Sequence, residues 1–194
     1  MQTSDALEAL TPVVETLQKL GVRYYICGSF ASVFYGIPRA TTDVDLVADL
    51  SKRHVASFVE SLRGRYYIDE RMILDAIARK SCFNVIYLST SFKVDIFVAK
   101  DRPYDRKSME RIRQDSLDDE HPTQQFSLPS PEDVVLSKLE WFRLGDEVSE
   151  RQWRDVIGIL KVEAVLLDRP YLEKWAVELG IADLLAKAWK ESEI

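Results

Sequence analysis

The chain has 194 residues, 46% of them hydrophobic, and a net charge of −6. That apolar content can bury a full core, either as one large domain or as a core domain with a small appendage. The acidic balance argues against a broad nucleic-acid surface, which needs a basic face. No apolar run is long enough to cross a membrane and no signal pattern opens the chain. We therefore expect a soluble, cytoplasmic protein without a membrane partner.

The first predicted element is a helix with one apolar stripe. Its apolar residues follow the three-four spacing of a core-facing helix: Leu7, Leu10, Val14 and Leu17. Pro12 either starts the main part of this helix or kinks it, and Gly21 ends it. We expect this helix to be purely structural.

The apolar run 24–27 predicts a strand, which Gly28 and Ser29 close. Ser29 is placed to cap a short helix over 30–35, whose free N–H groups favour an anion, and Gly28 lets the backbone approach a phosphate. An ordinary strand-to-helix turn explains the same two residues equally well. In the next loop, Arg39 offers paired donors to a nucleotide phosphate or to a neighbouring aspartate.

Asp43 and Asp45 lie two residues apart in a run with strand character, residues 42–48. Strand alternation puts both carboxylates on one face and turns Val44 and Leu46 toward the core. Two carboxylates this close repel each other unless a cation lies between them, and ligands that offer only oxygen suit Mg²⁺. Asp-x-Asp pairs also line solvated strand edges, so the pair alone does not identify a metal site.

A third carboxylate, Asp95, lies on the second strand of a predicted hairpin, residues 82–88 and 92–98. Before this hairpin the sequence predicts helices over 52–63 and 70–80 and a short strand over 66–68. Alternation along 92–98 puts Lys93, Asp95 and Phe97 on one face. A lone Asp among apolar neighbours is disfavoured in a strand unless it is paired or bound to metal. The hairpin is expected to place Asp95 beside the Asp43 strand, where the three carboxylates converge.

Residues 101–125 alternate basic and acidic side chains, a pattern typical of a solvated helix face or loop. A grip of its arginines on RNA is the alternative. Cys27 and Cys82 lie in apolar, strand-like runs without a Cys-x-x-Cys motif. We expect both to be small core residues and predict neither a zinc site nor a disulfide.

The C-terminal third predicts a helical bundle. Ser130 and Pro131 start a helix that Gly145 ends, and Ser149 begins a capping box for the next helix. Two further helices begin near Pro170 and Ala182. We therefore divide the chain into a core, residues 1–126, and a helical segment, residues 127–194, packed against the sheet.

Gly-Ser, then Asp-x-Asp, then a third Asp on a later strand resembles the pattern of the nucleotidyltransferase superfamily. The closer resemblance is to AbiEii/AbiGii-type toxin nucleotidyltransferases. These proteins carry an Arg-x-Ser/Thr-x-Asp-x-Asp run, which is matched here by Arg39, Thr41, Asp43 and Asp45. Gly28-Ser29 departs from the Gly-Gly usual in the toxin group. Further signature residues match Lys138 and the Arg154-Asp155 pair. By resemblance Lys138 reaches toward the nucleotide phosphates, although Lys138 and Asp155 are equally typical of exposed helix residues.

The resemblance implies an α/β (α+β) fold with a mixed sheet flanked by helices and a C-terminal helical bundle. It implies a metal-dependent enzyme that moves a nucleoside monophosphate from a nucleoside triphosphate to a hydroxyl and releases pyrophosphate. Mg²⁺ or Mn²⁺ would be held by Asp43, Asp45 and Asp95, and Asp95 would also act as the base. Gly28, Ser29, Arg39, Thr41 and Lys138 would bind the nucleotide.

Two other functions fit the same residues. One alternative is a catalytically weak nucleotide-sensing or interaction module of a toxin–antitoxin pair, with an antitoxin protein as partner. The other is an antibiotic-modifying nucleotidyltransferase. The complete set of three carboxylates favours an enzyme, since an inert module has no use for them. The acceptor stays open among tRNA, a protein hydroxyl and a small molecule, as does the base of the nucleotide.

Overall fold

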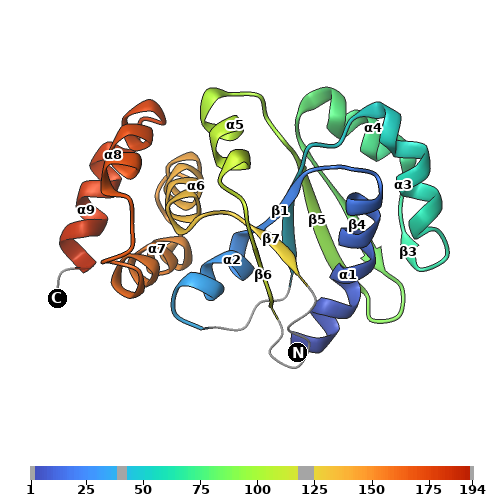
Figure 1. The fold of residues 1–194 in the computed structure, drawn as a ribbon, viewed down its shortest axis with the longest axis horizontal. Coiled ribbons are helices and arrows are strands. Elements are labelled where there is room, and N and C mark those ends of the chain that lie inside the picture. The colour runs from blue at the N-terminus through green and yellow to red at the C-terminus, as the bar shows by residue number, and fades with distance from the viewer. Residues whose placement is uncertain (1–2, 39–42, 118–124, 193–194) are drawn as a thin grey trace.

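The computed structural model describes residues 3–38, 43–117 and 125–192. Figure 1 shows a central sheet with helices on both sides and a group of helices at the C-terminal end of the molecule. The elements that build the sheet half are α1 (Thr3–Lys19), β1 (Tyr24–Cys27), α2 (Gly28–Tyr35), β2 (Val44–Ala48), η1 (Lys52–His54), α3 (Val55–Leu62), β3 (Tyr66–Tyr67), α4 (Glu70–Arg79), β4 (Cys82–Tyr87) and β5 (Phe92–Val98). The remaining elements are α5 (Pro103–Glu110), β6 (Arg113–Asp115), β7 (Phe126–Leu128), α6 (Pro131–Leu144), α7 (Glu150–Val162), α8 (Arg169–Glu178) and α9 (Ala182–Ser192).

Within the described residues the main sheet has the strand order β1-β2-β5-β4-β3. β4 and β5 form the predicted antiparallel hairpin, whereas β2 and β5 run parallel, with Asp45 opposite Asp95. A parallel pair needs a long crossover, which the segment from α3 to β4 supplies. The mixed sheet flanked by helices confirms the predicted fold class.

The two faces of the sheet differ as strand alternation predicts. One face is apolar and fully buried: Val44, Leu46, Val94 and Ile96 have no exposed surface and belong to the core cluster that α1 and α3 complete. On the other face lie the polar residues of the same strands, among them Asp45 and Asp95, with α2 packed close by. Alternation within β2 and β5 therefore separates the core from the polar face.

The C-terminal helices have a core cluster of their own, drawn mainly from α6, α7, α8 and α9. Ser130 and Ser149 cap α6 and α7 as predicted, each accepting a hydrogen bond from a backbone N–H three residues on. Tyr104 from α5 and Ala31 from α2 also belong to this cluster. Tyr104 and Ala31 thus pack across the proposed boundary between residues 126 and 127. The division of the chain at that boundary stays a prediction.

Of the two alternatives for Pro12, a start of the main helix is wrong, because Pro12 lies inside α1, where its carbonyl accepts a hydrogen bond from Thr16 Oγ1. Three other details of the sequence prediction are also wrong. Ser29 does not cap α2, because the helix already begins at Gly28, and its N-cap residue, Cys27, makes no side-chain cap bond. Cys82 is exposed. The mixed-charge run is not simply solvated either, since residues of α5 reach the core and arginines of the run pair with α6.

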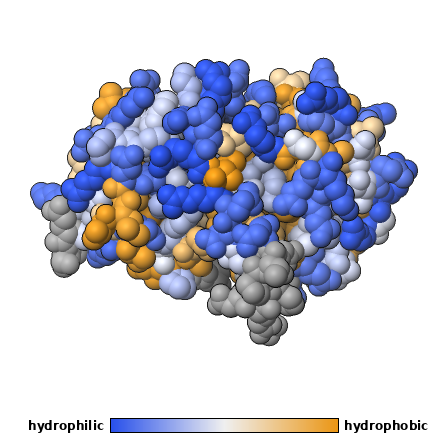
Figure 2. All heavy atoms as spheres, in the orientation of Figure 1, coloured by the Kyte–Doolittle hydropathy of each residue, from blue (hydrophilic) through white to orange (hydrophobic). Residues whose placement is uncertain are grey.

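The outer surface is mainly hydrophilic on the face drawn in Figure 2, with a hydrophobic patch over the C-terminal helices at the lower left. Several large apolar side chains of these helices and their loops are exposed: Leu144, Val148, Val162, Val165, Leu166 and Val177. In the part of the chain that is described, the longest apolar stretch of helix falls short of a membrane span.

Candidate active site

The turn from β1 into α2 lies directly against a carboxylate. Gly28 has a φ of +61°, and a Cβ added there would lie 1.9 Å from Asp45 Oδ2. The strand register explains this closeness, because Cys27 pairs with Asp45 across β1 and β2. Glycine is therefore required at position 28 twice over, by the left-handed backbone and by the carboxylate beside it.

Asp45 lies among other acids. Its neighbour across the parallel pair is Asp95, and Asp43 precedes it by two residues on the chain. Burial and, to a smaller extent, the charges of Asp43 and Asp95 raise the pKa of Asp45 to about 6, while Lys138 and Lys93 act in the opposite direction. The three predicted acids thus interact with one another, as the sequence pattern indicated.

The acid cluster contains a basic residue that the sequence analysis did not use. Lys93 Nζ lies 2.6 Å from Asp95 Oδ2 in an ion pair. The hydrogen bond to Asp95 raises the pKa of Lys93 against the effect of burial, and the charges of Asp95, Asp43 and Asp45 add to it. Strand alternation already places Lys93 on the face of Asp95, so the signal was present in the sequence.

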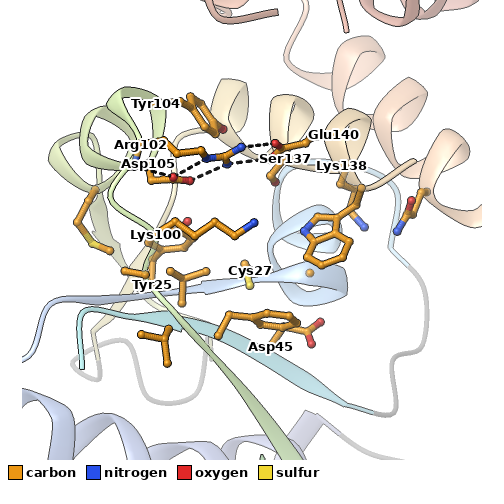
Figure 3. Close-up of a pocket in the computed structure, with 18 residues that line it drawn as sticks. Tyr25, Cys27, Asp45, Lys100, Arg102, Tyr104, Asp105, Ser137, Lys138 and Glu140 are labelled. Carbon is orange, nitrogen blue, oxygen red and sulfur yellow. Dashed lines mark hydrogen bonds and ion pairs between the residues drawn. The ribbon is translucent and has the colours of Figure 1, made fainter. Parts of the chain in front are cut away.

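A cavity of about 310 Å³ opens beside Asp45, between the polar face of the sheet and α5, α6 and α7 (Figure 3). The sheet contributes Cys27, Asp45 and Phe97, and α6 contributes Ser137, Lys138 and Trp141. The Phe97 and Trp141 rings meet edge to face at 5.9 Å between centroids. The cavity thus combines one acidic end with an aromatic wall, and its volume falls in the range of small-molecule sites.

Lys138 lines this cavity and is not an exposed helix residue. Its Nζ lies 2.7 Å from Asp155 Oδ2, and the two side chains are only 10% and 7% exposed. The reading of Lys138 and Asp155 as exposed helix residues is therefore wrong, because α7 packs against α6 at this point. Arg154, by contrast, is largely exposed and pairs with Glu150.

A second acidic group lies across the cavity, on the side away from Asp45 in Figure 3. Asp105 of α5 and Glu140 of α6 both accept hydrogen bonds from the guanidinium of Arg102, whose Nε lies 2.7 Å from Asp105 Oδ2. This guanidinium joins α5 to α6, and its single positive charge is shared between the two acids. Sequence reasoning missed the cluster because Glu140 lies 38 residues from Arg102.

The donor atoms beside Asp45 suit a hard divalent cation. Asp43 and Asp45 offer only oxygen, and burial together with the charges of Asp43 and Asp95 raises the pKa of Asp45. Among the described residues, however, no three His, Cys, Asp or Glu side chains are grouped as metal ligands. In this geometry the Asp95 carboxylate contacts Lys93. The predicted site with three acidic ligands stays a prediction, and Arg39 and Thr41 lie outside the described residues.

The chain matches no family model and no curated protein sequence. Its structure is similar to the solution structure of the antibiotic-resistance factor ANT(2'')-Ia, with a TM-score of 0.53 at 17% identity, covering 96% of this chain and 94% of that one. It is also similar to the crystal structure of an antigenic nucleotidyltransferase-like protein from Paracoccidioides brasiliensis. There the TM-score is 0.55 at 17% identity, over 96% of this chain and 93% of that one.

Such low identity makes the likeness one of fold. The chain shares the fold of these two structures, which agrees with the predicted architecture. The narrower resemblance to AbiEii-type toxins stays a prediction.

Proposed function

We propose that the chain is a metal-dependent nucleotidyltransferase that moves a nucleoside monophosphate from a nucleoside triphosphate to a hydroxyl acceptor. The observation that carries this proposal is the register of β2 and β5, which pairs Asp45 with Asp95 while the Asp45 carboxyl lies against Gly28 and lines a cavity. Acids gathered in a cleft with a perturbed pKa are typical of functional sites. The nucleotidyltransferase-like fold supports the same conclusion.

Asp43 and Asp45 would hold Mg²⁺ or Mn²⁺. When bound, such an ion neutralises charge on the triphosphate. Gly28 brings the start of α2 against the Asp45 carboxylate, so phosphates held by an ion at Asp45 would lie near the helix N-terminus, where Ser29 also lies and the helix dipole favours an anion. Lys138 lies at the wall of the cavity, where its ammonium is paired with Asp155.

Asp95 would take the proton of the acceptor hydroxyl. The acceptor oxygen forms its bond to the α-phosphorus as the bond from that phosphorus to the bridging oxygen of the β-phosphate breaks, and pyrophosphate leaves with the electron pair. The Asp95 side chain is 16% exposed, so an acceptor can reach it from solvent. Proton acceptance by a positioned carboxylate is ordinary general-base chemistry.

The cavity would hold the nucleoside part of the nucleotide. Phe97 and Trp141 offer aromatic surface to a base, and the side-chain amide oxygen Oε1 of Gln152, a residue of the cavity lining, is buried without a hydrogen-bond partner. An unpaired buried acceptor is costly, and a donor on the ligand removes that cost. A cavity of about 310 Å³ lies at the small end of ligand sites, which favours one bound molecule there.

The identity of the acceptor is the finer part of this proposal. The resemblance to AbiEii-type toxins favours a macromolecular acceptor such as tRNA or a protein, and a toxin role with an antitoxin partner. The similarity in fold to an antibiotic-resistance factor makes a small-molecule acceptor the second candidate. A nucleotide-sensing module would bind the nucleotide without turning it over.

The test is transfer of label. The protein is incubated with Mg²⁺, total cell extract and each nucleoside triphosphate in turn, labelled at the α-phosphate. Label should appear in an RNA, protein or small-molecule fraction, and parallel reactions labelled at the γ-phosphate should give none. Asp45→Asn and Asp95→Asn are the controls, and both should give none. Binding of nucleotide without labelling of any fraction would instead support the sensing module.

A further inference from the structure

We infer that Asn84 binds the acceptor and aligns its hydroxyl for attack. This inference rests on the proposed function, because it assigns the acceptor side of the same site. Asn84 lies on β4, beside the strand that carries the proposed base, Asp95. No motif of the sequence includes Asn84, so the pairing of the strands alone gives it a place at the site.

The strand register lines up four residues across the sheet. Cys27 pairs with Asp45, and Asp45 pairs with Asp95. Asp95 in turn pairs with Asn84 across the antiparallel strands β5 and β4. Directly opposite residues of such a pair point to the same face, with Cβ atoms about 5 Å apart. The Asn84 amide is therefore the neighbour of the Asp95 carboxylate on the side away from Asp45.

This row gives the reaction a direction along the sheet. In the proposed function the outer phosphates lie near the start of α2, which follows β1 directly at Gly28. Pyrophosphate therefore leaves toward β1. The attacking and leaving oxygens lie roughly in line on opposite sides of the phosphorus, so the acceptor hydroxyl enters from the other side. There β5 carries Asp95 and β4 is the next strand, and the body of the acceptor lies over β4.

The polar face of β4 is accessible, as an acceptor site must be. α4, the helix that packs against β4, lies on the opposite face, where Ile73 and Ala76 join the core cluster. On the polar face Cys82 is exposed, and Asn84 and Ile86 are half-buried. α2 packs against β1 and β2 instead, and the cavity extends from these strands to the end of β5. The sheet thus has a covered side for the nucleotide and an open side for the acceptor.

The chemistry of Asn84 suits this position. A side-chain amide both donates and accepts hydrogen bonds and carries no charge. Asparagine is disfavoured in strands, and the adjacent positions of β4, Phe83 and Val85, are apolar core residues. An acceptor hydroxyl at hydrogen-bonding distance from Asp95, about 3 Å, brings the polar groups next to it within reach of the Asn84 amide.

The experiment separates acceptor binding from nucleotide binding. The proteins compared are the unaltered chain, Asn84→Leu, Asn84→Ala and Cys82→Ala. Leucine keeps the approximate shape of asparagine without its hydrogen-bonding groups, and alanine provides a second replacement if leucine disturbs the sheet. Cys82→Ala is the matched control, since it changes the same face of the same strand opposite Phe97. Melting temperatures verify folding throughout.

The probes are the nucleoside triphosphate that gives transfer in the labelling test and a dilution series of the extract fraction that it labels. Calorimetry in the presence of Mg²⁺ measures nucleotide affinity, and initial rates of labelling are measured at limiting and at saturating amounts of the fraction. We expect both Asn84 variants to lower the rate at limiting acceptor by about tenfold, through the loss of one or two hydrogen bonds, with nucleotide affinity unchanged. Cys82→Ala should change neither quantity.

Labelling by both Asn84 variants at the rate of the unaltered chain would overturn the inference and leave the proposed function standing. The same holds for an equal loss in Cys82→Ala, or for a parallel loss of nucleotide affinity, which would put Asn84 on the nucleotide side. Absence of label from every fraction with the unaltered chain would overturn the proposed function and this inference with it.

Discussion

The cavity has an acidic group on each of two sides, and the two groups differ in their counter-charges. Asp105 and Glu140 share the guanidinium of Arg102, which gives hydrogen bonds to both. At the sheet, burial and the neighbouring charges of Asp43 and Asp95 raise the pKa of Asp45 to about 6. In the first group Arg102 offsets one of the two negative charges. In the second, Lys93 pairs with Asp95, and the three acids keep the larger excess of negative charge, as expected for a site that completes itself with a ligand.

The largest expected effect is on catalysis. Asp45→Asn should lower the rate of nucleotidyl transfer by about 10³-fold, because the amide is a poor metal ligand and the charge that holds the cation is lost. Glu140→Gln, which changes an acid of the Arg102 group on the far side of the cavity, should lower the transfer rate much less, because Glu140 holds no metal in the proposed function. Initial rates at saturating nucleotide measure both. Similar losses in the two variants would remove the functional distinction between the two groups.

Gly28→Ala should destabilise the fold more than Gly180→Ala. Both glycines have positive φ, +61° and +69°, so both variants incur backbone strain of about 1 kcal/mol. The Gly28 variant also drives a Cβ into Asp45 Oδ2, whereas a Cβ at Gly180 meets nothing within 4 Å. We expect Gly28→Ala to lower the free energy of unfolding by about 1 to 2 kcal/mol more than Gly180→Ala does, as measured by urea denaturation. Equal losses would show that Asp45 moves aside freely.

Arg102→Met should cost about 1 to 2 kcal/mol of folding free energy. It leaves Asp105 and Glu140 without the cation they share, and the figure is discounted because the Arg102 side chain is 40% exposed. Arg154→Met provides the control, since Arg154 and Glu150 are both at least 80% exposed and their pair contributes little. Chemical denaturation of both variants gives the comparison. If Arg154→Met lowered the free energy of unfolding as much as Arg102→Met does, the prediction would be contradicted.

The smallest effect is the response to pH and metal. The pKa of Asp45 is raised from 3.8 to about 6, so in the metal-free protein its contribution to stability is complete below about pH 3.8 and lost as the pH rises through about 6. Mn²⁺ at tenfold its dissociation constant should restore about 1.4 kcal/mol near pH 7.5. The gain should shrink near pH 5, where protons compete for the carboxylate. Thermal unfolding measures this, and a gain that Asp45→Asn keeps would place the metal elsewhere.

The local part of this structure was predictable from the sequence. Alternation of polar and apolar residues in 43–48 and 92–98 gave the faces of Asp45 and Asp95 correctly, because side-chain direction in a strand has a period of two. Serine, proline and glycine marked the ends of α6 and α7 for equally local reasons. The pairing of β2 with β5 followed from the resemblance and the hairpin together.

Long-range side-chain contacts were not predictable. Lys138 and Asp155 looked like exposed residues because nothing within either helix shows that α6 and α7 pack at that point. Arg102 lay in a run that resembles a solvated loop, although its partners come from two different helices. The helix after β1 was predicted to begin two residues too late, with Ser29 as its N-cap in place of Cys27, an ordinary error at a helix boundary.

The parallel pairing of β2 and β5 also dictates an order of assembly. As a nascent chain leaves the ribosome, β1 and β2 emerge early, and Asp45 emerges with them. β5 follows only after α3, β3, α4 and β4. Until it docks, the edge of β2 stays open, and closing so long a loop is the kind of non-local step that slows folding. A chain arrested before β5 therefore exposes a sheet edge next to Asp45 and lacks both Lys93 and Asp95.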